Sequence, residues 1–359
     1  MNIKKLAAVL AASVIAVTAV TVTAFAAGTK VPITEKYFPD ENFREYVSQF
    51  DADGNGYLSQ KERDAVTEIN VGDSFWELYN KIRSLKGICY FKNLEKLYCG
   101  TNELTNIDIS KNTQLKLLYC NENKLTRLDI SSNTELQHLD CANNNITELD
   151  ISRKNKLAWL DCHENKLTNL DVSNNIKLEY LDCSDNKLAQ IDTSKNAELY
   201  ELVCDNNKLK KLDVSQNAKL EYLNCDNNRL EELDVSNNTE LEALSCKNNE
   251  LSSLNISKNV TLEDLDCSDN KLTQLDTSKN AELYKLVCDN NKLKKLDVSQ
   301  NAKLEYLNCD NNRLAELDVS NNTELEVLSC ENNELSSLNI SKNVRLEKFY
   351  CDENVKIIK

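Results

Sequence analysis

Six residues between positions 51 and 62 carry oxygen atoms at the spacing that a hard cation requires. They are Asp51, Asp53, Asn55, Tyr57, Ser59 and Glu62. The first three would supply side-chain oxygens, Tyr57 its carbonyl, Ser59 a contact through water, and Glu62 two oxygens that close the shell. Gly56 permits the sharp turn between them. The pattern predicts a calcium site.

These residues match an EF-hand calcium loop at every informative position. A short amphipathic helix is predicted just before the loop, over residues 38–47. A single extracellular loop of this type should bind calcium weakly, at roughly 10⁻⁴–10⁻³ M. We therefore expect a structural ion that stiffens this segment. The alternative is a helical cap that keeps the loop shape without metal.

Cysteine is the second residue type with chemical potential. Thirteen of the fourteen cysteines stand 21 residues apart, from Cys99 to Cys351, and Cys89 alone is out of step. Many cysteines in an exported chain normally indicate disulfides. Neighbouring strands, however, would place these Cβ atoms about 4.8 Å apart, whereas a disulfide needs about 3.8 Å. We expect small, buried, free thiols.

The 21-residue unit reads Leu-x-x-Leu-x-Cys-x-x-Asn-x-Leu-x-x-Leu-Asp-Val-Ser-x-Asn-x-x. Its alternating apolar residues predict a short strand, and one unit cannot bury its apolar side without stacked neighbours. The unit resembles the leucine-rich repeat over residues 94–356, with Cys in place of the third Leu. The resemblance implies an α/β solenoid, an arc with one parallel β-sheet on its concave face. Residues 94–359 would form thirteen units, the last truncated.

Two polar columns have a structural explanation. The asparagines that run from Asn102 to Asn354 should satisfy backbone groups of their own and the next coil. The Asp-x-Ser pairs, such as Asp129 with Ser131, should cap turns. Residues 183–266 and 267–350 differ at ten of 84 positions, so a block of four coils was duplicated. Duplication favours the extension of a surface over the invention of a catalytic site.

The segment before the repeats divides into three parts. Residues 1–26 have a basic start, an apolar run and a small-residue end, which predicts a cleaved signal peptide, with an uncleaved anchor as the alternative. Residues 30–65 form the EF-hand-like cap. Residues 66–93 are a degenerate first repeat, interrupted by an insertion around residues 72–81 with Trp76 and Tyr79. Secretion, with possible retention at the cell surface, is the expected location.

A helical cap followed by short leucine-rich coils resembles the internalin type of bacterial surface protein. In that family the cap usually lacks a working calcium loop, whereas here the ligands are kept. The resemblance implies a protein partner bound on the concave sheet. Leucine-rich coils alone do not identify that partner.

The residues that flank the inward Leu and Cys should form the concave surface. We expect partner-binding residues in the least repetitive part of this face and at two exposed tyrosines: His138, Trp159, Tyr180, Asp140, Asp161, Asp182, Tyr222 and Tyr306. Aromatic side chains there have no core to fill and are typical interface anchors. The patch suits a basic or glycosylated protein. Scattered solvated side chains, a carbohydrate-binding module and a structural component of the cell envelope are the alternatives.

Other function classes fit poorly. The net charge of −15 opposes binding to nucleic acid. The sequence has no second long apolar stretch, so we expect no membrane insertion after signal cleavage. Of the two histidines, His138 and His163 lie four residues out of register on adjacent strands and cannot share a metal. No nucleophile elbow or phosphate loop appears. Face carboxylates are expected to be open to water, so we expect no enzyme.

The carboxyl-terminal coil is short. Lys356 stands where a repeat Leu is expected, and the return segment after it is missing. The residues that should therefore be partly exposed along a free strand edge are Leu346, Phe349, Ile357 and Ile358. This edge predicts fraying or self-association through the last coil.

Overall fold

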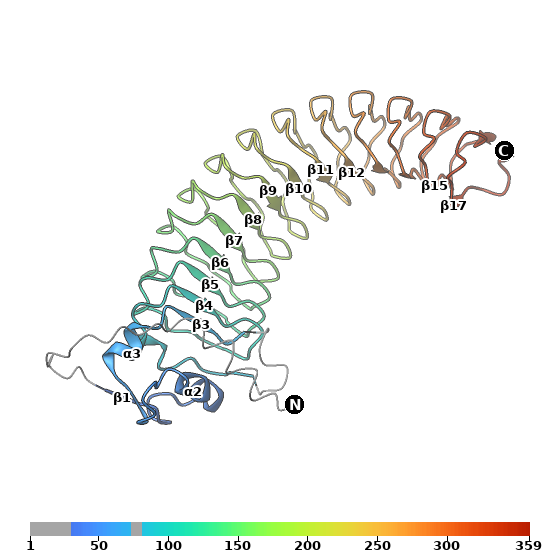
Figure 1. Ribbon diagram of the computed structural model, residues 1–359. Coiled ribbons are helices and arrows are strands. Elements are labelled where there is room, and N and C mark those ends of the chain that lie inside the picture. Colours follow the sequence, from blue (N-terminus) through green and yellow to red (C-terminus); the bar gives the residue numbers. More distant parts are fainter. Residues whose placement is uncertain (1–29, 73–80) are drawn as a thin grey trace, which may run out of the picture.

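The computed structural model describes residues 30–72 and 81–359. These residues form an arc of stacked coils with a small helical cap at the amino end (Figure 1). The predicted signal peptide and the insertion residues Trp76 and Tyr79 lie outside the described residues. None of the described helices is both long enough and apolar enough to cross a membrane.

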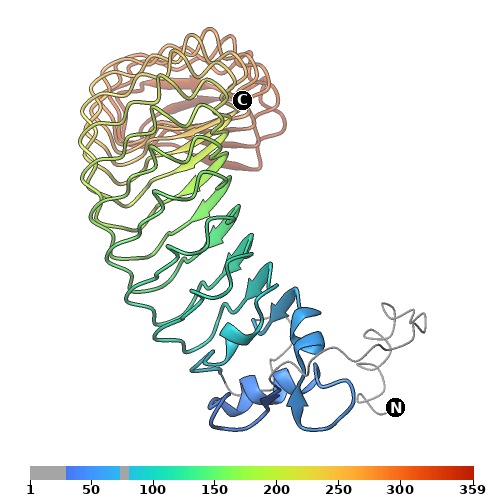
Figure 2. The same cartoon turned by 90° about the vertical axis from the view of Figure 1, so that its left-hand side faces the viewer.

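One parallel sheet of 14 strands lines the inner side of the arc, as the repeat pattern predicts (Figure 1). It has one strand more than the thirteen repeat units, because the degenerate first coil contributes β3 and its Ile69 pairs with Leu97. Each strand follows its neighbour along the same side of the stack (Figure 2). The strands are β3 (Glu68–Asn70), β4 (Lys96–Tyr98), β5 (Leu117–Tyr119), β6 (His138–Asp140), β7 (Trp159–Asp161), β8 (Tyr180–Asp182), β9 (Glu201–Val203), β10 (Tyr222–Asn224), β11 (Ala243–Ser245), β12 (Asp264–Asp266), β13 (Lys285–Val287), β14 (Tyr306–Asn308), β15 (Val327–Ser329) and β17 (Lys348–Tyr350).

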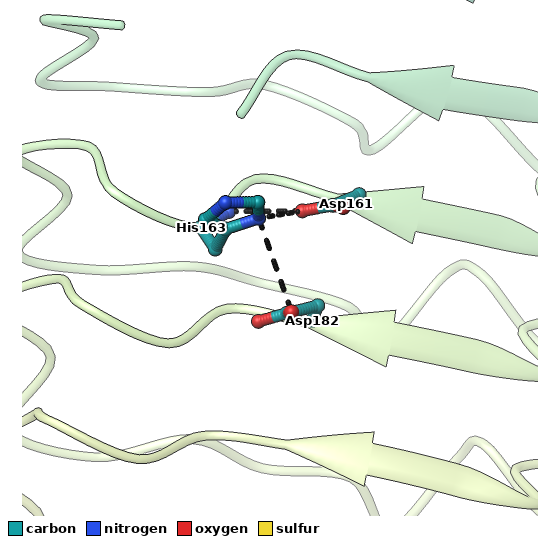
Figure 3. A group of neighbouring side chains, drawn as sticks. All are labelled: Asp161, His163 and Asp182. Carbon is teal, nitrogen blue, oxygen red and sulfur yellow. Dashed lines mark hydrogen bonds and ion pairs between the residues drawn. The ribbon is translucent and has the colours of Figure 1, made fainter. Parts of the chain in front are cut away.

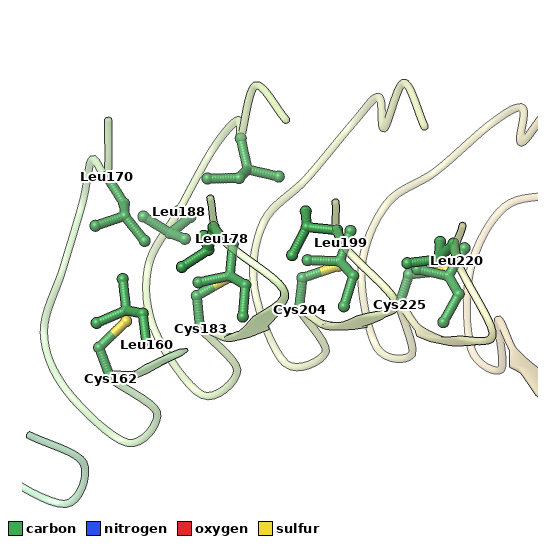
Figure 4. Packing of buried hydrophobic residues seen from close by; sticks show 14 of the residues in the cluster. Leu160, Cys162, Leu170, Leu178, Cys183, Leu188, Leu199, Cys204, Leu220 and Cys225 are labelled. Atoms are coloured by element: carbon green, nitrogen blue, oxygen red, sulfur yellow. The ribbon is translucent and has the colours of Figure 1, made fainter. Parts of the chain in front are cut away.

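The core repeats with the sequence. In the coils from β4 to β15 the strand Leu and the following Cys point inward and meet the same residues of the next coil, as Leu160 and Cys162 do (Figure 4). The cysteines from Cys99 to Cys330 are fully buried, and all fourteen are free. Burial raises the pKa of these thiols above its ordinary value because it disfavours the thiolate. They are therefore apolar filling with little nucleophilic character.

Buried asparagines tie each coil to the one before it. Asn144 Nδ2 donates to the carbonyls of Cys120 and Cys141, and Asn144 Oδ1 accepts from Leu125 N at 2.9 Å. The prediction of bonds to the next coil was wrong in direction, because the amide faces the strand end of the preceding coil. Asn354, the last of the column, is exposed. The Asp-x-Ser pairs cap turns as predicted, with Ser131 N donating to Asp129 Oδ1 at 3.0 Å.

The cap covers the first coil. Helix α2 (Glu41–Ser48) starts at Asp40, whose side chain accepts from Phe43 N, and buries Phe43 and Val47. The loop that follows contains β2 (Tyr57–Leu58), which pairs antiparallel with β1 (Val31–Pro32). Helix α3 (Gln60–Asp64) and a short 3-10 turn, η2 (Ile88–Tyr90), complete the segment.

The carboxyl end is better closed than predicted. A two-stranded parallel sheet joins β16 (Ser337–Asn339) to β18 (Lys356–Ile358), so the tail does form a return strand. Asp352 accepts from Asn332 N at 2.9 Å and thereby caps the preceding coil. The predicted partial exposure of Leu346, Phe349 and Ile357 is confirmed, and Ile358 is 43% exposed. Self-association through this edge stays a prediction.

Candidate functional site

The least repetitive part of the concave face lies on β6, β7 and β8. His138 is the register partner of Trp159, and Trp159 is the partner of Tyr180, so the three side chains stand in one cross-strand row. The Trp159 and Tyr180 rings stack face to face, with centroids 3.6 Å apart and planes 2° apart. A second stacked pair, Tyr98 with Tyr119, lies on β4 and β5. Both pairs present rigid aromatic surface that the core does not use.

A row of carboxylates runs beside the aromatic row. Asp140, Asp161 and Asp182 occupy equivalent positions at the ends of β6, β7 and β8, because the strands pair without offset. The side chains of Asp161 and Asp182 are only 17% and 15% exposed. The prediction that these carboxylates are open to water was wrong, since the neighbouring coils on either side cover them.

Burial changes the acidity of this row. Desolvation, reinforced by the nearby charge of Asp161, raises the pKa of Asp140 to about 6, although a hydrogen bond from Ala142 N opposes the rise. Burial also raises the pKa of Asp182, whose Oδ1 accepts from Ser184 N and Ser184 Oγ. Negative charge is therefore concentrated and partly desolvated here, which suits a cationic ligand.

His163 belongs to this patch, although it was not among the predicted partner-binding residues. Its Nδ1 lies 2.7 Å from Asp161 Oδ1 and 3.9 Å from Asp182 Oδ2 (Figure 3). The hydrogen bond with Asp161 is the main reason that the pKa of His163 rises to about 9. The signal was available in the sequence, because residues 161 and 163 are two apart at a strand end and so share a face.

The other predicted face residues do not join the patch. Tyr222 lies on β10 and Tyr306 on β14, each in a coil of its own farther along the arc (Figure 1). Tyr222 is 38% exposed and Tyr306 is half-buried. They occupy the same position in the two identical coils 204–224 and 288–308. They are thus a repeated feature of the face rather than part of one cluster.

The predicted calcium ligands converge in the cap. Carboxylate oxygens of Asp51, Asp53 and Glu62 lie within 4.8 Å of one another. Gly56, at φ 79°, adopts the left-handed turn, and its N–H donates to Asp51 Oδ2 at 2.7 Å. The Asn55 side chain accepts from Tyr57 N at 3.0 Å.

Glu62 also closes this loop. Its two carboxylate oxygens accept from Ala52 N and Ser59 N, which draws the end of the loop over its beginning. The hydrogen bond from Ser59 is the main reason that the pKa of Glu62 falls below its ordinary value. The loop therefore brings together the carboxylate oxygens of Asp51, Asp53 and Glu62, which are the donor type that a hard cation needs.

The two copies of the duplicated block, residues 183–266 and 267–350, can be compared position by position. Three positions per coil face the concave side: three before, one before and one after each Cys. In four coils these positions number 12 of 84, yet they hold five of the ten differences between the copies. The five pairs are Glu201 and Lys285, Ala243 and Val327, Lys247 and Glu331, Asp264 and Lys348, and Asp266 and Tyr350. Divergence is concentrated on the concave face.

Comparison with solved structures agrees with this architecture. The functional domain of InlJ from Listeria monocytogenes, which includes a cysteine ladder, is similar to this chain at 33% identity and a TM-score of 0.80. The match covers 93% of this chain and 78% of that one. The chain belongs to the internalin-like leucine-rich-repeat proteins.

Two further structures share the fold of this internalin-like chain. The internalin InlF from Listeria monocytogenes is 24% identical, with a TM-score of 0.72, covering 92% of this chain and 94% of that one. The leucine-rich effector YopM from Yersinia pestis is 24% identical, with a TM-score of 0.64 and coverage of 89% and 84%. No family model and no curated protein sequence matches the chain.

Proposed function

We propose that this internalin-like chain is an extracellular protein-binding module, and that its partner docks on the concave face around β6, β7 and β8. The observation that carries the proposal is the stacked Trp159–Tyr180 pair beside the half-buried row Asp140, Asp161 and Asp182. A flat aromatic pair supplies contact area at little entropic cost, and the carboxylates select a basic segment. The internalin-like fold is consistent with protein binding.

The divergence of the duplicated coils supports the same face. Core and turn positions of the two copies are almost unchanged, whereas Glu201 corresponds to Lys285 and Asp264 to Lys348. In the second copy the substitution creates an ion pair on the face, because Lys285 Nζ lies 2.9 Å from Asp264 Oδ2. A surface without a ligand would accumulate changes equally on its convex side.

The test is differential capture on the immobilised chain. Host and bacterial surface extracts and a panel of glycans are passed over the wild type, a Trp159→Ala/Tyr180→Ala variant and a Tyr284→Ala control. Tyr284 is 40% exposed and directly precedes β13, outside the patch. A protein retained by wild type and control and lost from the double variant is the expected result.

Three other outcomes would contradict this proposal. Retention of a glycan without protein, again lost in the double variant, would favour the carbohydrate-binding alternative. Equal retention by all three forms would exclude this patch as the docking surface. No retention under any condition would favour a structural component of the cell envelope.

We also propose that the cap loop holds a structural calcium ion. Asp51, Asp53, Asn55 and Glu62 would supply side-chain oxygens and Tyr57 its carbonyl, with Ser59 acting through water. Bound calcium would supply only charge and geometry, fixing the loop between α2 and α3 and so the packing of Leu58, which is fully buried. No role in recognition follows from this position.

Calcium binding is tested by melting of the cap. Millimolar calcium should raise the melting temperature of the wild type, because the ion binds the folded loop in preference to the unfolded chain. Glu62→Gln should abolish the rise, whereas Glu45→Gln, an exposed change on α2, should keep it. An unchanged wild-type melt would show that the loop shape is kept without metal.

A further inference from the structure

One cluster on the concave face combines an imidazole with two carboxylates. Single ligand atoms of Asp161, His163 and Asp182 all lie within 4.8 Å of one another. Figure 3 shows the His163 ring beyond the end of β7, with Nδ1 directed at both carboxylates. Residues 30–72 and 81–359 contain two groups of side chains close enough to hold a metal ion. One is the cap loop, and the other is this cluster, which alone of the two contains a histidine.

Sheet register fixes the position of all three residues. Asp161 and Asp182 are register partners on β7 and β8, and His163 follows Asp161 by two residues on the same face. The position of His163 is occupied by Ala142 in the coil before and by Ser184 in the coil after. The imidazole therefore lies beside the carboxylates of two consecutive coils. In no other repeat of the sequence does a histidine occupy this position.

The cluster carries more negative charge than its own histidine neutralises. The carboxyl groups of Asp140, Asp161 and Asp182 stand at equivalent positions on three consecutive strands beside a single imidazole. The side chains of Asp161 and Asp182 are only 17% and 15% exposed, so little water is available to screen them from each other. A divalent cation between them would offset that repulsion.

The donor atoms are arranged as ligands. Asp182 Oδ1 is committed to Ser184, which leaves Oδ2 facing His163 Nδ1 at 3.9 Å. Asp161 Oδ1 is 2.7 Å from the same nitrogen. Zinc bonds of about 2.0–2.2 Å in a tetrahedral site place ligand atoms roughly 3.3–3.6 Å apart, and the two observed separations bracket that value. Small side-chain rotations would equalise them.

The far side of the imidazole has a partner as well. His163 Nε2 lies 3.0 Å from Nδ2 of the Asn143 side-chain amide, which comes from the preceding coil. A metal-bound histidine normally donates its other ring N–H to an oxygen that fixes the ring. A 180° flip of the Asn143 amide would present Oδ1 to that N–H in place of Nδ2.

We propose that Asp161, His163 and Asp182 bind a zinc-class divalent ion through His163 Nδ1 and one oxygen of each carboxylate. A site with three protein ligands, one of them an imidazole nitrogen, suits zinc. It disfavours calcium, which takes six to eight oxygens. The fourth position of such an ion would be left to water or to a donor group of a bound partner, since only three protein ligands are available.

The binding test uses zinc alone and the full chain, with excess calcium to saturate the cap loop and reductant to keep the thiols free. Isothermal titration should show one zinc site in the wild type. His163→Gln should weaken zinc binding by about tenfold or more. Loss of a residue that only supports a ligand already costs about that much, and loss of the ligand itself should cost at least as much. His138→Gln is the matched control, because His138 is the other histidine of the chain and lies on the same face. It should leave the zinc affinity unchanged, since His138 is not part of the cluster.

The result that would overturn the proposal is equal zinc affinity in wild type and His163→Gln, or no binding at millimolar zinc. Cobalt(II) separates the ligand types, since it should give visible bands without the intense near-ultraviolet band of a thiolate. A thiolate band would assign the metal to cysteine and sink the proposal. Proton release, measured in buffers of different ionisation enthalpy, should be about one per zinc in the wild type and absent in His163→Gln.

None of these measurements requires the protein partner. Failure of zinc binding would leave the docking proposal standing, and failure of the patch variants in capture would leave the zinc site standing. If both hold, zinc should strengthen partner retention in the wild type and have no effect in His163→Gln.

Discussion

The coils that contain β6, β7 and β8 share their backbone and core with the duplicated coils between residues 183 and 350, but they present a different face. Both regions bury Leu and Cys at identical places, as Leu160 with Cys162 and Leu244 with Cys246 do. On the face, the first region has a stacked aromatic pair, a row of three aspartates and a histidine. The duplicated region has isolated tyrosines and alternating charges, among them the Lys285–Asp264 pair.

This difference shows how the fold separates stability from recognition. Inward and turn columns repeat because each coil must fit its neighbours, whereas most side chains of the face columns stay partly exposed. A substitution in the core should therefore act alike in both regions, and a substitution on the face should act in one region only. The predictions below test that division, beginning with the core.

Charge in the cysteine column should have the largest effect, and it should be equal in both regions. Cys162 and Cys225 are each fully buried. Cys162→Asp and Cys225→Asp should each lower the free energy of unfolding by about 3–5 kcal/mol, because a buried carboxylate without a partner is left in the core. Cys→Ala at both positions is the control and should be far milder. Denaturant unfolding measures both, and a marked difference between the two Asp variants would show that the cores are not equivalent.

Truncation on the face should separate the regions. Trp159→Ala and Tyr180→Ala should each weaken a captured partner by about 2 kcal/mol or more, as interface anchors do. Tyr222→Ala and Tyr306→Ala should cost much less. All four variants should keep the wild-type melting temperature to within a few degrees. Dissociation constants from surface plasmon resonance would reverse the assignment if the Tyr222 and Tyr306 changes proved the more damaging.

The sequence was sufficient for the solenoid and insufficient for the chemistry of its face. A 21-residue period specifies register completely, so the positions of Trp159, Tyr180, Asp140, Asp161 and Asp182 followed from counting. Burial of the face carboxylates did not follow, because it depends on how closely neighbouring coils cover a half-exposed side chain. The return strand β18 was missed since Lys356 occupies a position where the repeat has Leu, and the pairing with β16 is made by the backbone.

The raised pKa of His163 gives the patch a pH dependence of stability that no histidine of the duplicated coils can give. The pKa of His163 rises from 6.5 to about 9. Its stabilising contribution is therefore fully present below pH 6.5 and is lost as pH rises through 9. His163→Gln should remove a decline on the order of 1 kcal/mol over that window, reduced from the full shift because part of the ring meets solvent.

The check is the difference in free energy of unfolding between wild type and His163→Gln at pH 6 and pH 9.5. His138→Gln serves as control, since His138 lies on the same face and forms no ion pair with a carboxylate in the described part of the chain. The duplicated coils contain no histidine. Their buried thiols have a raised pKa and also lose stability towards pH 9.5, but this loss is the same in wild type and variant and cancels in the difference. A decline of equal size in His163→Gln would show that its ion pair with Asp161 contributes nothing.

The smallest effect should come from a buried hydroxyl that one coil of each duplicated copy has and the patch coils lack. A second column of buried asparagines runs along the solenoid, and nine of its side-chain carbonyl oxygens have no protein partner in the described part of the chain. Asn217 and Asn301 differ, because Thr193 and Thr277 of the preceding coils donate to their Oδ1 atoms at 2.9 and 2.8 Å. The equivalent residue of the patch coil is Val172, which leaves Asn196 Oδ1 without such a donor.

Exchange of these residues should move stability in opposite directions. Val172→Thr is nearly isosteric, and its hydroxyl can reach Asn196 as Thr193 reaches Asn217, so it should raise the free energy of unfolding by up to about 1 kcal/mol. Thr193→Val should lower it by a similar or smaller amount, since the added methyl group offsets part of the lost hydrogen bond. Denaturant midpoints measured for both variants and for the double exchange give the answer. Destabilisation by Val172→Thr would mean that the cost of burying the hydroxyl exceeds the gain from satisfying the amide, and that the regions differ in coil spacing as well as in face.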